Sequence, residues 1–427
     1  MHVLTELIKN DMRPALGVTE PGAIAFAVAT ARSHMEGEVQ KVFLRLNSGM
    51  FKNAFTCGIP GSSEVGNYHA AALGAVAADP AKGLECLDGI SEEEARKAFE
   101  MVEDGRISVS MSEITSRIFI EAKAVGEHSE AKVTIRDAHT NIVEITENDR
   151  VVFAKEQKAQ EQEADSHLIH QYTLAQLYEY VSTVPVEEIS FIKDAFKMNE
   201  ELLEEGIRSS KTTYAPYLLA ANGGKLVSED ERKTASLFCN AAIEARVIGL
   251  SKPAMSITGS GAHGIIATMP LYAAYRVNGY TEEALLRATA LSYLICMYIK
   301  EYSGKLSAFC GCAIAAGTGM ACGLVSLRGG NTEVMEKTIN NMASSITGMI
   351  CDGGNQGCAM KGVVAVDAAY ASVDMAMNGV YIYNVHGING KTPEETMRNM
   401  GTIASPGMVG TEKTIVEILE TKKQIKG

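Results

Sequence analysis

The spacing of hydrophobic residues changes from a two-residue period to a three-to-four-residue period near the middle of the chain. Between residues 105 and 155, short segments alternate apolar and polar side chains and are separated by turn residues and charges. This pattern predicts a small, largely antiparallel sheet with one wet face. From about residue 168 onward, apolar residues recur at helical spacing. We therefore expect an α+β protein, with a small N-terminal α+β domain (1–165) and a larger all-helical domain (166–427) that carries the cysteines.

Several further segments of the N-terminal half have clear patterns. Residues 42–47 (VFLRLN) alternate as a strand does. Residues 23–32 and 69–78 are apolar and rich in alanine, which predicts buried helices. In the glycine-containing loop 17–22, Thr19 and Glu20 stand just before Pro21, an arrangement typical of a helix start. Residues 156–167 are polar and helix-prone and are the best candidate for a linker between the two domains.

Composition and charge exclude several classes of partner. The 427 residues favour two domains, and the net charge of −13 disfavours binding to nucleic acid or to anionic lipid. The N-terminus has an acidic residue where a signal peptide would have its apolar region. Residues 306–327 are uncharged and long enough to cross a bilayer, but they are rich in small residues, so we expect a tightly packed buried helix and turn. These features favour a cytoplasmic protein with no membrane partner.

Five of the nine cysteines fall within fifty residues, beside glycine-rich breaks in otherwise buried helices. Glycine within a helix lowers its stability. Where it occurs, it usually allows a special backbone angle or a close approach of the backbone to a ligand. The spacing matches neither a zinc ribbon nor a bacterial ferredoxin. Two interpretations remain: small packed thiols, or a metal site such as a cubane cluster held by three thiolates with one iron left open. The clustered cysteines are Cys310, Cys312, Cys322, Cys351 and Cys358.

Five motifs, in order along nearly the whole chain, resemble the iron–sulfur L-serine dehydratase α-chain / L-cysteine desulfidase family. The most specific are the TEP loop and the ICDG…GC segment. The motifs are ALGVTEPGAIAFA (15–27), GIPGSSEVGNYHAAALG (58–74), GSGAHGIIATMP (259–270), FCGCAIAAGTG (309–319) and GMICDGGNQGCAMK (348–361).

The resemblance implies an oxygen-sensitive [4Fe-4S] lyase without pyridoxal phosphate. Its substrate would be a small amino acid: L-cysteine, giving pyruvate, H₂S and NH₃, or L-serine, giving pyruvate and NH₃. By position, Cys312, Cys351 and Cys358 correspond to the three cluster ligands, with Cys310 as an alternative to Cys312.

The sequence departs from the family pattern at two of these loops. Val18 stands where the desulfidases usually have a cysteine, and Ala262-His263 replace Asn-Gln in the loop at 259–264. Both loops are expected to face the site. These departures put cysteine desulfidation in doubt and give weight to serine dehydration, another substrate or a paralogue that lacks the chemistry.

Elimination from an amino acid needs a base for the α-proton, an acid for the departing β-group and groups that hold the carboxylate. Glu20, His139, His263 and Lys361 are the candidate catalytic residues, although each also has a structural interpretation as a cap, a turn residue or a helix-end charge. Short polar side chains on glycine loops and the turn after His139 are candidate substrate-binding groups, although hydroxyls are also common in plain turns. These groups are Thr19, Ser62, Ser63, Asn141, Ser260 and Asn355.

Two rival functions remain at this point. One is a cluster-free paralogue that binds a small amino acid or a related carboxylate without turning it over. The other is a zinc-dependent or cluster-free hydrolase that uses His263. The small sheet is also compatible with a homodimer.

Overall fold

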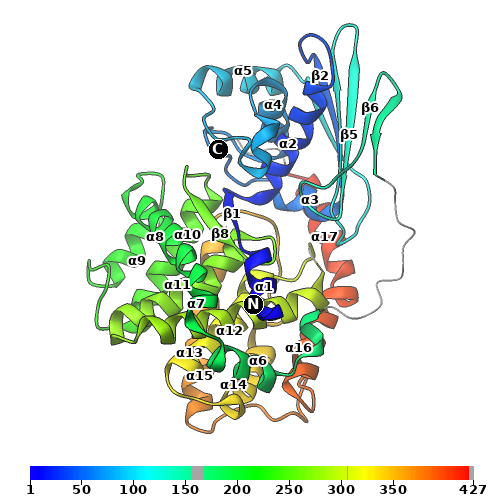
Figure 1. Cartoon of the computed structure of the whole chain (residues 1–427). Helices are drawn as coiled ribbons and strands as arrows, with labels where there is room; N and C mark the ends of the chain where they lie inside the picture. Colours follow the sequence, from blue (N-terminus) through cyan, green and yellow to red (C-terminus); the bar gives the residue numbers. More distant parts are fainter. Residues whose placement is uncertain (156–167, 305, 423–427) are drawn as a thin grey trace.

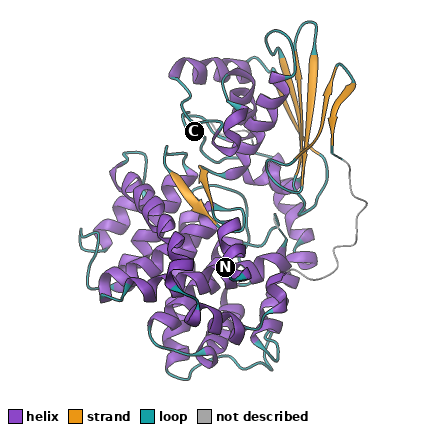
Figure 2. Ribbon diagram, viewed as in Figure 1, coloured by secondary structure: helices purple, strands orange, loops and turns teal. Residues whose placement is uncertain are grey.

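A six-stranded sheet and its covering helices form the upper part of the molecule (Figures 1 and 2). The computed structural model describes residues 1–155, 168–304 and 306–422. The strand order is β3-β2-β4-β5-β6-β7, and all neighbours are antiparallel except β2 and β3. The predicted mainly antiparallel sheet is therefore confirmed. The strands are β2 Lys41–Leu46, β3 Ile107–Met111, β4 Phe119–Val125, β5 Glu130–Arg136, β6 Ile142–Glu147 and β7 Arg150–Ala154.

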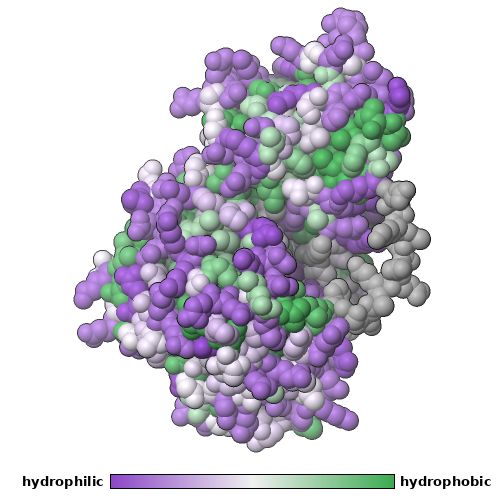
Figure 3. Space-filling view, in the orientation of Figure 1, coloured by the Kyte–Doolittle hydropathy of each residue, from purple (hydrophilic) through white to green (hydrophobic). Residues whose placement is uncertain are grey.

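Helix α2 packs against β4 and β5 and covers one face of this sheet, together with α4. The other face is wet, as the alternation predicts: every second residue of β2 is exposed. This solvent-exposed side is not uniformly polar, because Figure 3 also shows hydrophobic side chains gathered over the strands. The helices of this part are α2 Thr19–Ser33, α3 Ser48–Asn53, α4 Gly66–Val76 and α5 Glu92–Glu103.

The lower part is helical, as predicted, and its centre is formed by three consecutive helices, α10 to α12, with α13 and α15 packed against them. Its helices are α6 Leu174–Thr183, α7 Val186–Ile189, α8 Lys193–Arg208, α9 Tyr214–Ala221, α10 Glu231–Val247, α11 Gly261–Asn278, α12 Glu282–Ser303, α13 Gly317–Leu327, α14 Thr332–Ile346, α15 Gly357–Met377, α16 Pro393–Thr402 and α17 Val409–Glu420.

Both ends of the chain cross between the two parts. Helix α1 (Val3–Asp11) contacts α12, and β1 (Arg13–Leu16) pairs antiparallel with β8 (Pro253–Ser256) of the helical part. At the other end, α17 packs on α3 below the sheet. The division into 1–165 and 166–427 stays a prediction. The predicted linker, residues 156–167, lies outside the described residues.

Two helices begin within the loops that the sequence pattern indicated. Helix α2 begins at Thr19 rather than after Pro21, because proline has no N–H to lose and fits the first helical turn. Helix α11 begins at Gly261, so His263 lies in its first turn and not in an extended loop. Residues 312–327 form a π-helical turn followed by α13, almost entirely buried, as predicted. Within the described ranges, no helix is long and apolar enough to span a membrane.

Candidate functional site

Backbone hydrogen bonds join the two cysteine-bearing loops side by side. Phe309 and Ile350 form an antiparallel bridge, the N–H of Cys310 donates to the carbonyl of Met349 at 3.0 Å, and the N–H of Cys351 donates to the carbonyl of Ala308 at 2.6 Å. Forty residues of sequence separate the two loops. Pairing of the main chains therefore sets Cys310 and Cys351 next to each other.

The thiols of Cys310, Cys312, Cys351 and Cys358, named here the thiol group, lie within electrostatic range of one another. The Cys312 thiol donates to the sulfur of Cys310, which lowers the pKa of Cys310 to about 7. That bond, burial and the nearby Cys358 and Cys351 raise the pKa of Cys312. Burial raises the pKa of Cys358 to about 11. The three predicted ligands and their alternative thus form one local group.

The donor set of this group fits an iron–sulfur cluster. Thiolates are the usual ligands of [4Fe-4S] clusters. Because each thiolate binds a different iron, the sulfur atoms that hold a cluster are farther apart than the ligands of a single metal ion. Among the described residues, no three His, Cys, Asp or Glu side chains could hold a single metal ion. Lys52 and Lys361 lower the pKa of Cys351 against the larger effect of burial. Cations beside the thiols favour the thiolate form that binds metal.

Asn53, at the end of α3, connects the thiol group with two predicted catalytic residues. Its Nδ2 donates to Glu20 Oε1 at 2.9 Å, and the Cys351 thiol donates to its Oδ1 at 3.9 Å. His139 Nε2 lies 3.9 Å from the same Glu20 oxygen. The turn between β5 and β6 therefore brings His139 beside Glu20. Nothing in the periodicity around Asn53 had indicated this role.

Glycine in the Cys310-Gly311-Cys312 motif leaves room for two buried side chains of neighbouring helices. A Cβ on Gly311 would lie 2.7 Å from His263 Nε2 and 3.0 Å from a methylene carbon of Lys300. His263 Nδ1 is 2.5 Å from Thr258 Oγ1, and burial, with Lys300 and Arg246 nearby, holds the pKa of His263 well below its usual range. His263 is therefore a neutral imidazole packed on the backbone between two thiols.

Lys361 lies on α15, one turn after Cys358, and makes an ion pair with Asp352. Burial alone would lower the pKa of Lys361, but the bond to Asp352 and the nearby Cys358 sulfur outweigh it and raise the pKa. Lys361 is therefore a fixed cation beside the thiol group. A charged ammonium suits binding of an anion better than proton abstraction.

Three of the predicted substrate-binding residues lie on the loops around the thiol group and the start of α11. Thr19 Oγ1 donates to the carbonyl of Gly259 at 3.5 Å, which joins the start of α2 to the loop before α11. Asn355 Oδ1 accepts from the N–H of Gly357 at 2.8 Å and so shapes the loop that carries the thiols. Ser260 is the N-cap residue of α11 and makes no side-chain cap.

Three predicted substrate-binding residues lie elsewhere. Ser62 and Ser63 line a separate groove of about 580 Å³, between the loop before α4 and the loop after α10. Asn141, in the turn between β5 and β6, accepts from Lys155 Nζ at 2.5 Å. Among the described residues, no hydrogen bond joins these three to a member of the thiol group.

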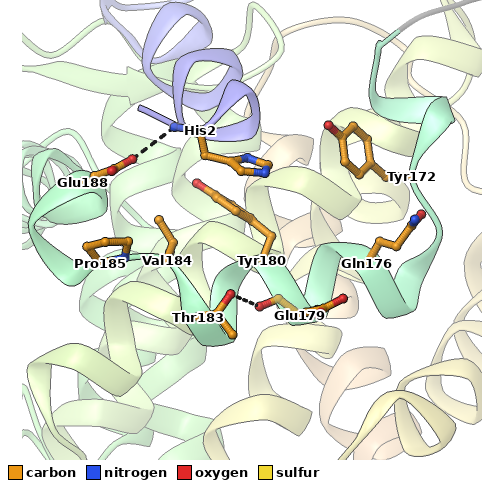
Figure 4. A pocket seen from close by; sticks show the side chains of 9 residues that line it. All are labelled: His2, Tyr172, Gln176, Glu179, Tyr180, Thr183, Val184, Pro185 and Glu188. Atoms are coloured by element: carbon orange, nitrogen blue, oxygen red, sulfur yellow. Dashed lines mark hydrogen bonds between the residues drawn. The ribbon is translucent and has the colours of Figure 1, made fainter.

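A second groove, also about 580 Å³, lies between the N-terminus and α6 (Figure 4). His2 stacks on Tyr180 there, and its backbone nitrogen donates to Glu188 at 3.1 Å. Neither groove is lined by a member of the thiol group.

The loop between Cys351 and Cys358 is held against α3 by glycines. Gly353 has φ +111°, and a Cβ there would lie 2.4 Å from the carbonyl oxygen of Lys52; a Cβ on Gly354 would lie 3.0 Å from a methyl of Val18. The position that departs from the family pattern, Val18, thus packs directly on the thiol loop.

Gly353→Ala is expected to push this loop away from α3. The left-handed backbone alone costs a residue with a Cβ about 1–2 kcal/mol, and the clash with Lys52 adds to it. The measurement is the free energy of unfolding, with the rate at which Cys351 reacts with a thiol reagent. Gly348→Ala is the matched control, because a Cβ there would meet nothing within 4 Å. Equal behaviour of the two variants would contradict the expectation.

Two buried cations of the site, Lys300 and Arg246, were not among the sequence predictions. Lys300 is the one charge in an otherwise apolar stretch of α12 (SYLICMYIK), and Arg246 shares a mainly apolar stretch of α10 with Glu244 (FCNAAIEARV). A buried charge is costly unless it is compensated, so such interruptions are the signal that could have identified them.

Comparisons with known proteins identify the family of the chain. A model of the serine dehydratase alpha chain family matches residues 81–417. A UPF0597 protein of Clostridium botulinum (strain Okra / Type B1) is 42% identical over 430 residues, 98% of each chain. A UPF0597 protein of Caldanaerobacter subterraneus is 35% identical over 426 residues, 99% of each chain. The names of these relatives state no reaction. Because the family model covers most of the chain, including the whole thiol group, the protein belongs to the serine dehydratase alpha chain family.

Proposed function

We propose that the protein is an iron–sulfur lyase that eliminates the β-substituent and ammonia from a small amino acid, without pyridoxal phosphate. The observation that carries this proposal is the pairing of two glycine-rich loops, which gathers the thiol group beside Glu20, His139 and His263. Family membership supports a lyase. We propose a [4Fe-4S] cluster as the cofactor and L-serine or L-cysteine as the substrate.

Cys312, Cys351 and Cys358 would hold the cluster, with Cys310 as the alternative to Cys312. When bound, a [4Fe-4S] cluster with three thiolate ligands supplies an open iron, a Lewis acid that polarises the departing hydroxyl or thiol. Lys52, Lys300 and Lys361 offset the negative charge that such a group brings.

The residues of the chain supply the proton transfers. A base takes the α-proton, the electron pair forms the Cα=Cβ bond, and the β-group leaves with a proton as water or H₂S. The resulting enamine tautomerises to an imine, which water hydrolyses to pyruvate and ammonia. Glu20 is the best placed base, because Asn53 fixes its carboxylate and His139 stands beside it to pass the proton on.

His263 suits the acid–base step at the departing group. It is kept neutral by burial, and Thr258 fixes its other ring nitrogen. Lys361, paired with Asp352, serves better to hold charge than to accept a proton.

A binding protein without turnover is the second candidate, and Val18 is the observation that favours it. A valine cannot bind iron or transfer protons, and it packs against Gly354 of the thiol loop. In this case the amino-acid site would be kept and the chemistry lost.

Anaerobic reconstitution with iron and sulfide tests the proposal. We expect the protein to retain iron and acid-labile sulfide, to change its visible spectrum on addition of L-serine or L-cysteine, and to form pyruvate from one of them. A protein that stays iron-free after reconstitution and still binds the amino acid would favour the second candidate. If the protein retains the cluster but neither amino acid changes its spectrum or gives pyruvate, these two substrates are refuted.

A further inference from the structure

Arg246, near the end of α10, is a buried arginine without a counter-ion. Its exposed fraction is 5%, and its Nε has no hydrogen-bond partner. Among the described residues, none forms a hydrogen bond or ion pair with the side chain of Arg246. Burying an unpaired guanidinium costs several kcal/mol, and a buried arginine is normally paired. The charge therefore points to an anionic ligand that completes the site.

The side chain of Arg246 packs on the N-terminus of α11. A Cβ on Gly261, the first residue of that helix, would lie 2.6 Å from Arg246 Nε. Ser260, the N-cap residue, provides no side-chain cap, and α11 is eighteen residues long. The first N–H groups of such a helix lack partners within the helix, and its dipole favours negative charge. Arg246 and the N-terminus of α11 would therefore both attract the same anion.

The region between Arg246 and the N-terminus of α11 borders the proposed active site. Thr19, next to Glu20, donates to the carbonyl of Gly259, and His263 is in the same first turn of α11 as Gly261. A Cβ on Gly259 would meet nothing within 4 Å, so the loop borders open space. Glu20 and Arg246 act in opposite directions on the pKa of Cys57, whose main determinant is burial, so both charges lie near that thiol.

We propose that Arg246 and the N-terminal N–H groups of α11 bind the α-carboxylate of the amino-acid substrate. This inference rests on the proposed function in taking a small amino acid as the ligand, but it does not require turnover. A guanidinium offers two parallel N–H donors to a carboxylate, the geometry best matched to it, and a lysine at the same place could offer only a point charge. The α-carbon would then lie between His263 on α11 and Glu20 on α2.

Binding of L-alanine and L-alaninamide to the full-length protein tests this assignment by calorimetry. L-alanine has the α-carboxylate but no β-leaving group, so it cannot be turned over; in the amide the carboxylate is neutral. We expect wild type to prefer L-alanine and Arg246→Met to lose at least about tenfold in affinity for it, because a hydrogen bond to a charged group contributes about 1.5–3 kcal/mol. The amide should bind both proteins alike, and Arg246→Lys should restore part of the preference.

Two controls separate binding from folding. Arg232→Met removes an exposed arginine of the same helix, paired with Asp367 at 2.7 Å, and should leave binding unchanged. Because Arg246 has no partner to lose, Arg246→Met should keep or raise the melting temperature, whereas loss of a structural ion pair would lower it. An unchanged preference for L-alanine in Arg246→Met, or a wild type that binds both probes equally, would overturn the inference. Tight binding of L-alanine without any lyase activity would overturn the proposed function alone.

Discussion

Cys351→Ser is expected to abolish retention of the iron–sulfur cluster. Cys351 is held among the members of the thiol group by the backbone bond to Ala308, and its thiol donates to Asn53 Oδ1. Serine keeps the size of the side chain but replaces the thiolate, the ligand that iron–sulfur clusters require. After anaerobic reconstitution and desalting, iron and acid-labile sulfide should fall to background, and pyruvate formation with them.

Cys86→Ser is the matched control for this substitution. Cys86 is also buried, but its thiol donates to the carbonyl of Gly22 and belongs to the packing beneath α2. It should retain the iron content of wild type, with at most a modest loss of stability. Equal iron content in Cys351→Ser and Cys86→Ser would refute the ligand assignment. Comparison of Cys310→Ser with Cys312→Ser decides which of these two cysteines is the third ligand. We expect only Cys312→Ser to lose iron.

Glu412→Gln is expected to destabilise the fold by about 3–5 kcal/mol, because it leaves a buried ammonium without its counter-charge. Lys52 Nζ on α3 donates to Glu412 Oε2 on α17 at 2.7 Å and to the carbonyl of Ser307 at 2.9 Å. The Lys52 side chain is fully buried and that of Glu412 is 6% exposed. The pair joins the C-terminal helix to the helix that supports the thiol loop. The measurement is the free energy of unfolding in urea.

Breaking the neighbouring pair on the same helix provides the comparison. Lys413 and Glu417 are 3.8 Å apart and both more than half exposed, so Lys413→Ala should cost about 0–1 kcal/mol. A double replacement, Lys52→Met with Glu412→Leu, should recover much of the lost stability, since removing both charges leaves neither unpaired. A loss in Glu412→Gln no larger than that in Lys413→Ala would show that this ion pair does not hold α17 to α3. Loosening of α3 should also speed the reaction of Cys351 with thiol reagents.

Local pattern alone determined much of this fold. The alternation of residues 105–155 and 42–47 identified the six-stranded sheet, and the helical period identified the large helical part. Both follow from the period of side-chain direction in strands and helices, a property of each segment by itself. The clustering of thiols on glycine loops, with the five ordered motifs, indicated the family and the region of the site.

Tertiary structure alone decided which residues meet there. Pairing of β1 with β8 joins residues 237 to 243 positions apart, and Glu412 of α17 pairs with Lys52 of α3. Asn53 gains its role only because α3 packs beside the thiol loop and α2 at once. In the sequence, Arg246 is one charged residue of a helix. Only the fold shows that its side chain is buried where no described residue forms a hydrogen bond or ion pair with it. Contacts between distant segments leave no local periodic signature, and the cost of a buried charge depends wholly on what the fold places around it.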